Sequence, residues 1–87
     1  TFDEAKRAAN LLKHRMDFAD APLVFNGVTY DFEDGRRNFG EVRMISIGHL
    51  LGRMVMVVWT ERTGSRRIIS MRKCNGREQA IYGPRFR

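Results

Sequence analysis

Three apolar segments separated by short turns occupy the C-terminal half of the chain, and their spacing constrains the fold most. The segments cover residues 42–48, 54–59 and 67–71. The connections, residues 48–52 and 63–65, contain glycine and are short enough for hairpins. The middle segment is nearly all apolar, so we expect it to be buried on both faces of a sheet. The pattern predicts an antiparallel meander.

A fourth strand is expected before these three. Asn26-Gly27 is a strong turn signal, and residues 28–32 then have the composition of a short strand. Residues 33–40, which are polar and contain glycine, are predicted to form a loop. The sheet should therefore contain about four strands.

Helical patterns flank the predicted sheet on both sides in the sequence. Residues 2–16 predict an amphipathic helix, which starts either at a capping box of Thr1 and Glu4 or at Asp3 as N-cap. A short second helix is expected from residue 17 or 20 to residue 25, and a last helix over residues 73–82. One side of the first helix is apolar and the other polar: Ala5, Ala8, Ala9, Leu12 and Met16 against Lys6, Arg7, Asn10 and Lys13.

This order predicts an α+β fold in which N-terminal helices pack on the antiparallel sheet and a C-terminal helix follows. We expect the helices to cover one face of the sheet and leave the other face free. With 87 residues and 10.1 kDa, the chain has room for one domain, which excludes a multidomain enzyme.

Charge is the informative part of the composition. The formal net charge is +6, and 13 of the 16 basic residues are arginine, whose planar guanidinium suits directional contact with phosphate or carboxylate. Residues 1–43 carry seven basic and eight acidic residues, whereas residues 44–87 carry nine and two. A polyanion or an acidic protein is the natural partner. The alternative is a basic surface that serves only solubility.

Cysteine and histidine are too sparse for several classes of site. The single Cys74 excludes an internal disulfide and fits a reducing compartment. His14 and His49 lie 35 residues apart without metal-ligand spacing, so we expect no metal and no cofactor. Without a membrane-length apolar run or a signal-peptide pattern, the protein is expected to be cytoplasmic and not membrane-bound.

Four sequence patterns together closely resemble the BrnT family of toxins. These patterns are F-D-x-x-K-x-x-x-N-x-x-K-H at residues 2–14, G-E-V-R at 40–43, T-E-R at 60–62 and R-I-I-S-x-R-K-x-x-x-x-E-x-x-x-Y at 67–82. The resemblance implies a RelE-like fold and metal-independent RNA cleavage that inhibits translation. It also implies neutralisation by a BrnA-like ribbon-helix-helix antitoxin, and operator DNA bound through the toxin–antitoxin complex.

The chain departs from the family pattern in two places. Members have glycine after K-H, where this chain has Arg15, so we expect helix 1 to end differently and His14 to be aimed differently. Members also begin with a short strand, which here would lie upstream of Thr1.

Metal-free RNA cleavage needs a base for the 2′-OH proton, a cation for the pentacoordinate phosphate and an acid for the leaving 5′-oxygen. His14 suits acid or base work near neutral pH, with an idle surface histidine as the alternative. Lys13 points about 100° away from His14 on a helix, so both can contact one substrate only along the helix edge. Lys13, Arg62, Lys73 and Arg77 are the predicted RNA contacts.

The last strand carries the other cations. Strict alternation places Arg67 on one face, with Ile69 and Met71, and Ser70 and Arg72 on the other. Arg72 and Lys73 are expected to bind a phosphate group at the point where the strand meets the last helix. Arg67 is a second catalytic candidate, with a cross-strand ion pair to Glu61 as the alternative.

Glu61 and Arg43 complete the predicted catalytic set. Glu61 can serve as general base or pair with an arginine, whereas Arg43 can stabilise phosphate charge or pair with Glu41 or Glu61. Glu78 and Tyr82 lie four residues apart, and with Ser70 they are assigned to a supporting shell that orders arginines. Phe39 and Tyr30 could stack on RNA.

Two other functions remain open at this stage. One is a noncatalytic nucleic-acid-binding or repressor-assembly protein, in which the same arginines contact only phosphates. The other is a degenerate toxin that is kept for its antitoxin partnership.

Overall fold

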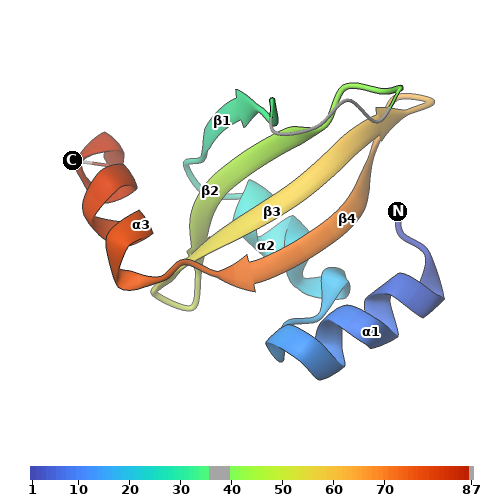
Figure 1. Cartoon of the computed structure of the whole chain (residues 1–87), viewed down its shortest axis with the longest axis horizontal. Coiled ribbons are helices and arrows are strands. Elements are labelled where there is room, and N and C mark those ends of the chain that lie inside the picture. The colour runs from blue at the N-terminus through green and yellow to red at the C-terminus, as the bar shows by residue number, and fades with distance from the viewer. Residues whose placement is uncertain (36–39, 87) are drawn as a thin grey trace.

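The structure is a computed structural model that describes residues 1–35 and 40–86. Its fold is α+β, with helices before and after an antiparallel sheet (Figure 1). The elements are α1 (Glu4–His14), η1 (Phe18–Asp20), α2 (Ala21–Phe25), β1 (Tyr30–Glu33), β2 (Met44–Leu50), β3 (Arg53–Arg62), β4 (Ser65–Lys73), α3 (Gly76–Tyr82) and η2 (Gly83–Phe86). In the described part of the chain, no helix is long and apolar enough to cross a membrane.

The predicted meander is confirmed. The strand order is β1-β2-β3-β4, and every neighbouring pair is antiparallel. Strands β3 and β4 are longer than predicted, and β2 is shifted toward the C-terminus, because each of the two hairpins closes over two residues. Leu51 and Thr63 accept positive φ values of 51° and 49° at the first of these positions, and glycine follows both. Part of the predicted 33–40 loop, residues 36–39 with Phe39, lies outside the described residues.

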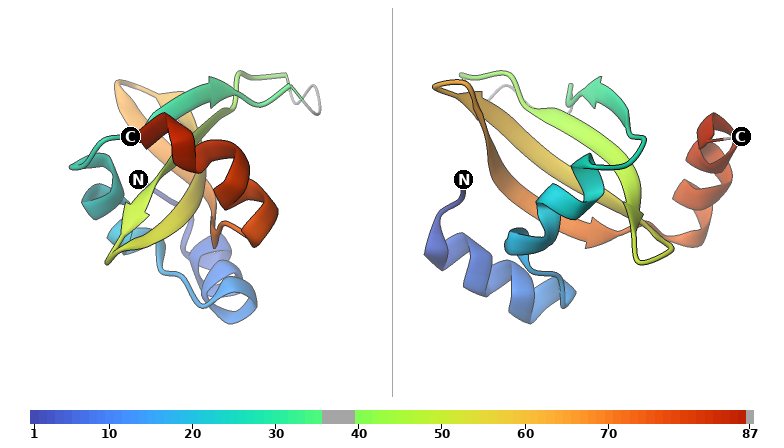
Figure 2. Two further views of the ribbon diagram at one scale, coloured as in Figure 1. Left: turned by 90° about the vertical axis from the view of Figure 1, so that its left-hand side faces the viewer. Right: turned by 180° about the vertical axis from the view of Figure 1, so that it is seen from behind.

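Both faces of the sheet carry an apolar core. Val55 and Val57 of β3 pack with Phe18 and Val24 under the N-terminal helices. On the opposite face, the core of Ile45, Ile47, Met56, Val58 and Cys74 packs against Tyr82 of α3 and Phe86 of η2. The expectation of a free second face is therefore wrong, because α3 folds back over one end of it (Figure 2).

The last helix is shorter than predicted. Strand β4 runs on to Lys73, and α3 begins only after Asn75, whose side chain caps it. The Asn75 side chain accepts a bond from the Glu78 N–H at 2.9 Å, and Glu78 Oε1 accepts one from the Asn75 N–H at 2.9 Å. This reciprocal capping box overrides the helix-compatible composition of the preceding residues.

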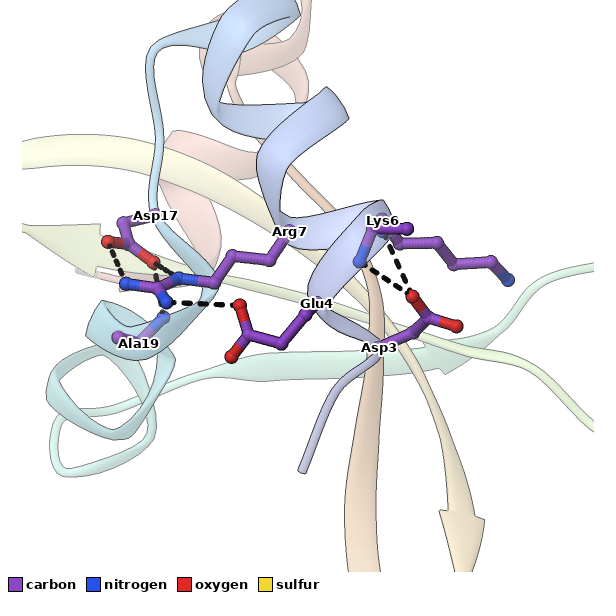
Figure 3. A network of polar contacts seen from close by, with 7 residues as sticks. Asp3, Glu4, Lys6, Arg7, Asp17 and Ala19 are labelled. Atoms are coloured by element: carbon purple, nitrogen blue, oxygen red, sulfur yellow. Dashed lines mark hydrogen bonds and ion pairs between the residues drawn. The ribbon is translucent and has the colours of Figure 1, made fainter.

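Helix α1 starts at the second of its two candidate signals. Asp3 is the N-cap and accepts bonds from the backbone N–H groups of Ala5 and Lys6, at 2.8 and 3.2 Å (Figure 3). The helix ends at His14, with Arg15 in the left-handed conformation at φ 58°. The expectation that helix 1 ends differently without glycine is therefore wrong, since the arginine adopts the backbone conformation that a glycine stop would use.

Helix α1 packs with its polar side toward the sheet. Asn10 is buried and Arg7 and His14 are half-buried, whereas all of the apolar residues within the helix are exposed: Ala5, Ala8, Ala9, Leu11 and Leu12. The amphipathic pattern is present, but it is turned away from the core. Met16, which follows the helix, is the member of the predicted apolar side that is buried.

Candidate functional site

A bulge in β4 decides where the predicted cations point. Trp59 pairs with Ile68 and Val58 with Ser70, so Ile69 is an extra residue in β4. The bulge shifts the alternation of the β4 side chains between the two faces by one residue. Thr60 therefore pairs with Arg67 on one side of the bulge, and Met56 pairs with Arg72 on the other. The predicted division of the strand between two faces is therefore wrong.

Arg67, Ser70 and Arg72 share one face of β4, since their partners Thr60, Val58 and Met56 alternate regularly along β3. Ile68 and Met71 point to the other face, into the core beneath the N-terminal helices. Arg67 and Arg72 are five residues apart, roughly 15 Å along a strand, so they cannot contact the same phosphate.

Arg72 is held in place by several hydrogen bonds. It donates bonds from Nη1 to Glu78 Oε1 at 2.8 Å and from Nη2 to Glu78 Oε2 at 2.7 Å. Further contacts reach the Lys73 carbonyl at 3.3 Å and the Met56 sulfur at 3.3 Å. Because Glu78 is also locked into the cap of α3, the guanidinium is held where the strand meets the helix. Glu78 was expected to order an arginine near Tyr82, and in the structure its carboxylate pairs with Arg72, while its part in a functional site stays a prediction.

His14 lies near this arginine. Burial lowers the pKa of His14 below its usual 6.5, and the positive charges of Lys13 and Arg72 lower it further. The imidazole is therefore mainly neutral at pH 7 and able to accept a proton. Its position follows from α1, which is fastened to β4 through the buried Asn10: Nδ2 donates to the Met71 carbonyl at 2.7 Å, and Oδ1 accepts from the Met71 N–H at 3.2 Å.

A small pocket of about 200 Å³ borders the Arg72–Glu78 pair. Tyr82 lines it from α3, together with Phe32 and Met56, which were not among the predicted site residues. The Phe32 and Tyr82 rings stack at 5.7 Å with an interplanar angle of 22°. Both Phe32 and Met56 occupy apolar strand patterns that are typical of core residues, so the sequence carries no signal for them.

Tyr30 is half-buried and packs against this aromatic group, with the Arg85 guanidinium 4.8 Å from its ring centre. Lys73 and Arg77 are exposed beside the pocket elements, on β4 and α3.

The remaining predicted residues lie elsewhere. Arg43 and Arg62 approach opposite oxygens of Glu41, at 4.0 and 3.4 Å, near the other end of the strands. Arg67 lies close enough to Asp3 to help lower the pKa of that carboxyl, which is lowered chiefly by its bonds from the Lys6 and Ala5 N–H groups. Glu61 is not the cross-strand neighbour of Arg67, because Glu61 of β3 pairs with Arg66 and Arg67 pairs with Thr60.

Glu61 is on the opposite face from Arg72. It lines a larger open pocket of about 740 Å³ that contains none of the other predicted site residues. This pocket is formed beneath the N-terminal helices by aromatic rings, and the Arg66 guanidinium lies 4.0 and 5.0 Å from the ring centres of Phe25 and Trp59. The structure thus places His14 within the electrostatic reach of Arg72, which pairs with Glu78, and places Glu61 on the other face of the sheet.

Two other features bear on the chemistry. Cys74 is buried, and burial, helped by the Glu78 charge, raises the pKa of its thiol to about 11, so it is a poor nucleophile. Among residues 1–35 and 40–86, no three or more His, Cys, Asp or Glu side chains are grouped as a metal site requires.

Comparison with known proteins identifies the family of this chain. A search of individually curated proteins finds no match. A family model matches residues 2–78, and it describes the ribonuclease toxin, BrnT, of type II toxin–antitoxin systems. The match covers both α1, which carries His14, and the Arg72–Glu78 pair. The chain belongs to the BrnT family of ribonuclease toxins.

Proposed function

We propose that this toxin is a metal-independent endoribonuclease whose active site is built around His14 and Arg72. The observation that carries the proposal is the position of a neutral imidazole within the electrostatic reach of an arginine that a carboxylate holds in place. RNA cleavage through the 2′-OH requires a base that takes the 2′-OH proton and a nearby cation that stabilises the charge on the phosphate.

In this proposal His14 is the general base. A base with a pKa below 6.5 is deprotonated at neutral pH, so it can take the 2′-OH proton as that oxygen attacks the phosphorus. The same charges that lower the pKa also disfavour an imidazolium acid at rest. In this proposal the leaving 5′-oxygen takes its proton from water.

Arg72 stabilises the charge on the phosphate. Both of its terminal nitrogens already bond to Glu78, so the phosphate shares the guanidinium with that carboxylate or replaces one of its two bonds. Glu78 is therefore a positioning residue, and Tyr82 forms the wall beside it. Lys13, Lys73 and Arg77 surround this corner as RNA contacts.

A single RNA strand that follows β4 on the face of these side chains would meet Arg72, Ser70 and then Arg67. Arg43 and Arg62, toward the far end of the strands, extend this basic path, although Glu41 pairs with both. Glu61 has no place in this proposal, because it faces the opposite side of the sheet.

The family also implies an antitoxin partner. We propose that this partner is a BrnA-like ribbon-helix-helix protein, that the complex binds operator DNA, and that RNA cleavage by the free toxin inhibits translation. The +6 net charge supports an acidic or nucleic-acid partner.

Cleavage of a labelled, mixed-sequence RNA in EDTA tests the nuclease. Wild type should cut it, and His14→Ala and Arg72→Ala should lose about 10² to 10⁴ of the rate, as expected when a proton-transfer group or a charge-stabilising group is removed. His49→Ala is the matched control, because that imidazole is exposed on β2. A toxin that binds this RNA without cutting it would instead support the noncatalytic alternative.

A further inference from the structure

The apolar ridge of α1 is exposed to water along its length. Ala5, Ala8, Ala9 and Leu12 follow the i, i+3, i+4, i+7 spacing of one helix face, and all four are exposed. Leu12 is 81% exposed. Isolated surface leucines are ordinary, but a complete apolar helix face is normally the face that a helix buries. We call these four residues the α1 ridge.

Polar contacts on the other side of the helix fix this orientation. The Arg7 side chain donates two bonds to Asp17, from Nε at 2.7 Å and Nη2 at 2.9 Å. In Figure 3, Arg7 and Lys6 extend to different sides of α1. Asn10 is buried against β4 by its two bonds to Met71. Turning the α1 ridge inward would break all of these bonds, so another molecule has to cover it if it is to be buried.

The ridge has the shape of a helix-packing surface. Three of its four residues are alanines, which allow another helix to approach to the short end of the usual 8–10 Å between helix axes. Leu12 supplies the larger side chain that can insert between residues of a facing helix.

The charges beside the α1 ridge distinguish between the molecules that could cover it. Lys6 and Lys13 are seven residues apart, so both border the same edge of the ridge, and both are exposed. An antiparallel pairing of two copies of this chain would place these lysine edges against each other, and each copy carries a net charge of +6. A partner helix with acidic residues along one border would meet the same lysines favourably.

We propose that the α1 ridge is the docking surface for an amphipathic helix of the antitoxin, with an apolar stripe bordered by acidic side chains. This inference rests on the proposed function only in taking the antitoxin as the partner. The ridge lies on the opposite side of α1 from Asn10 and His14, so the contact is separate from the proposed catalytic residues.

Binding of purified antitoxin to toxin variants tests the proposal. The Ala8→Gln/Leu12→Gln double variant should raise the dissociation constant at least tenfold, and Lys6→Glu should also raise it. Glutamine is a good helix former and adds no charge, so α1 should persist, which a thermal melt checks. The matched control is Leu51→Gln, since Leu51 is 95% exposed on the β2–β3 hairpin.

An unchanged dissociation constant for the double variant would overturn the proposal. A wild-type toxin that sediments as a dimer, and a double variant that is monomeric with normal antitoxin affinity, would overturn it in favour of a second copy. RNA cleavage by the free double variant should equal that of wild type. If wild type itself does not cut RNA, the proposed nuclease fails, whereas a selective loss of antitoxin binding would still support the docking surface.

Discussion

The side chain of Asn10 pairs with the backbone of Met71 as a neighbouring strand would, donating at 2.7 Å to its carbonyl and accepting at 3.2 Å from its N–H. Its Nδ2 also donates to the Met16 carbonyl at 3.0 Å. One buried amide thus closes part of the outer edge of β4, which is otherwise open to pairing with another chain. Phe2 continues this cover through a parallel bridge to Ile68.

Asn10→Ala should therefore be strongly destabilising. It removes the partners of buried backbone groups, and we expect the free energy of unfolding to fall by about 3 kcal/mol in urea denaturation. Asn26→Ala, at an exposed helix end, should change it by less than about 0.5 kcal/mol. Equal stability of the two variants would show that the Asn10–Met71 pairing has no energetic role.

Arg15→Gly should stabilise the protein. Arg15 has a left-handed backbone conformation at φ 58°, which costs an L-residue other than glycine roughly 1 kcal/mol. Removing that strain should raise the melting temperature, whereas Arg15→Ala keeps the strain and should not. A glycine variant that melts no higher than the alanine variant would contradict this explanation.

Gly48→Ala should destabilise the packing of α2 on the sheet. A methyl group at this position would lie 2.7 Å from a Val24 methyl carbon and 3.1 Å from the Thr29 methyl carbon. Such overpacking costs about 1–3 kcal/mol. Gly35→Ala is the control, because among residues 1–35 and 40–86, its chain neighbours aside, no atom lies within 4 Å of the added methyl group. Denaturant midpoints should fall for the first variant and stay unchanged for the second.

Stability should decline in acid partly through the Arg7–Asp17 pair. Hydrogen bonds from Arg7 are the main cause that lowers the pKa of Asp17 from 3.8 to about 2. Because the folded-state value is the lower one, the stabilisation is complete above about pH 4 and is lost as the pH falls toward 2. Denaturation midpoints of Asp17→Asn should therefore fall less steeply over this range than those of wild type.

Local sequence signals were sufficient for the order of elements and for the meander. The continuous apolar run of residues 54–59, the short hairpins and the capping residues each act within a few positions, so they can be identified without tertiary information. The expectation that Glu78 orders an arginine came from its four-residue spacing to Tyr82, which is also local, whereas the pairing with Arg72 depends on the turn that joins β4 to α3.

Features that depend on long-range contacts were not predictable. The bulge at Ile69 shifts Arg67 onto the face of Arg72, and no local pattern marks it. The orientation of α1 depends on bonds from Arg7 and Asn10 to distant partners, which outweigh its apolar pattern. Glu61 and Arg72 lie on opposite faces because Glu61 pairs with Arg66 and Arg72 with Met56, and local sequence does not fix this strand register.

The pH dependence of RNA cleavage tests the role of His14 most directly. In EDTA, kcat/KM of wild type should rise with pH to a plateau that is reached by about pH 7, with a midpoint below the usual histidine value of 6.5. His14→Ala should lose this rise together with most of the rate, and His49→Ala should retain both. A His14→Ala toxin that cuts RNA at the wild-type rate, with the same pH profile, would contradict the account.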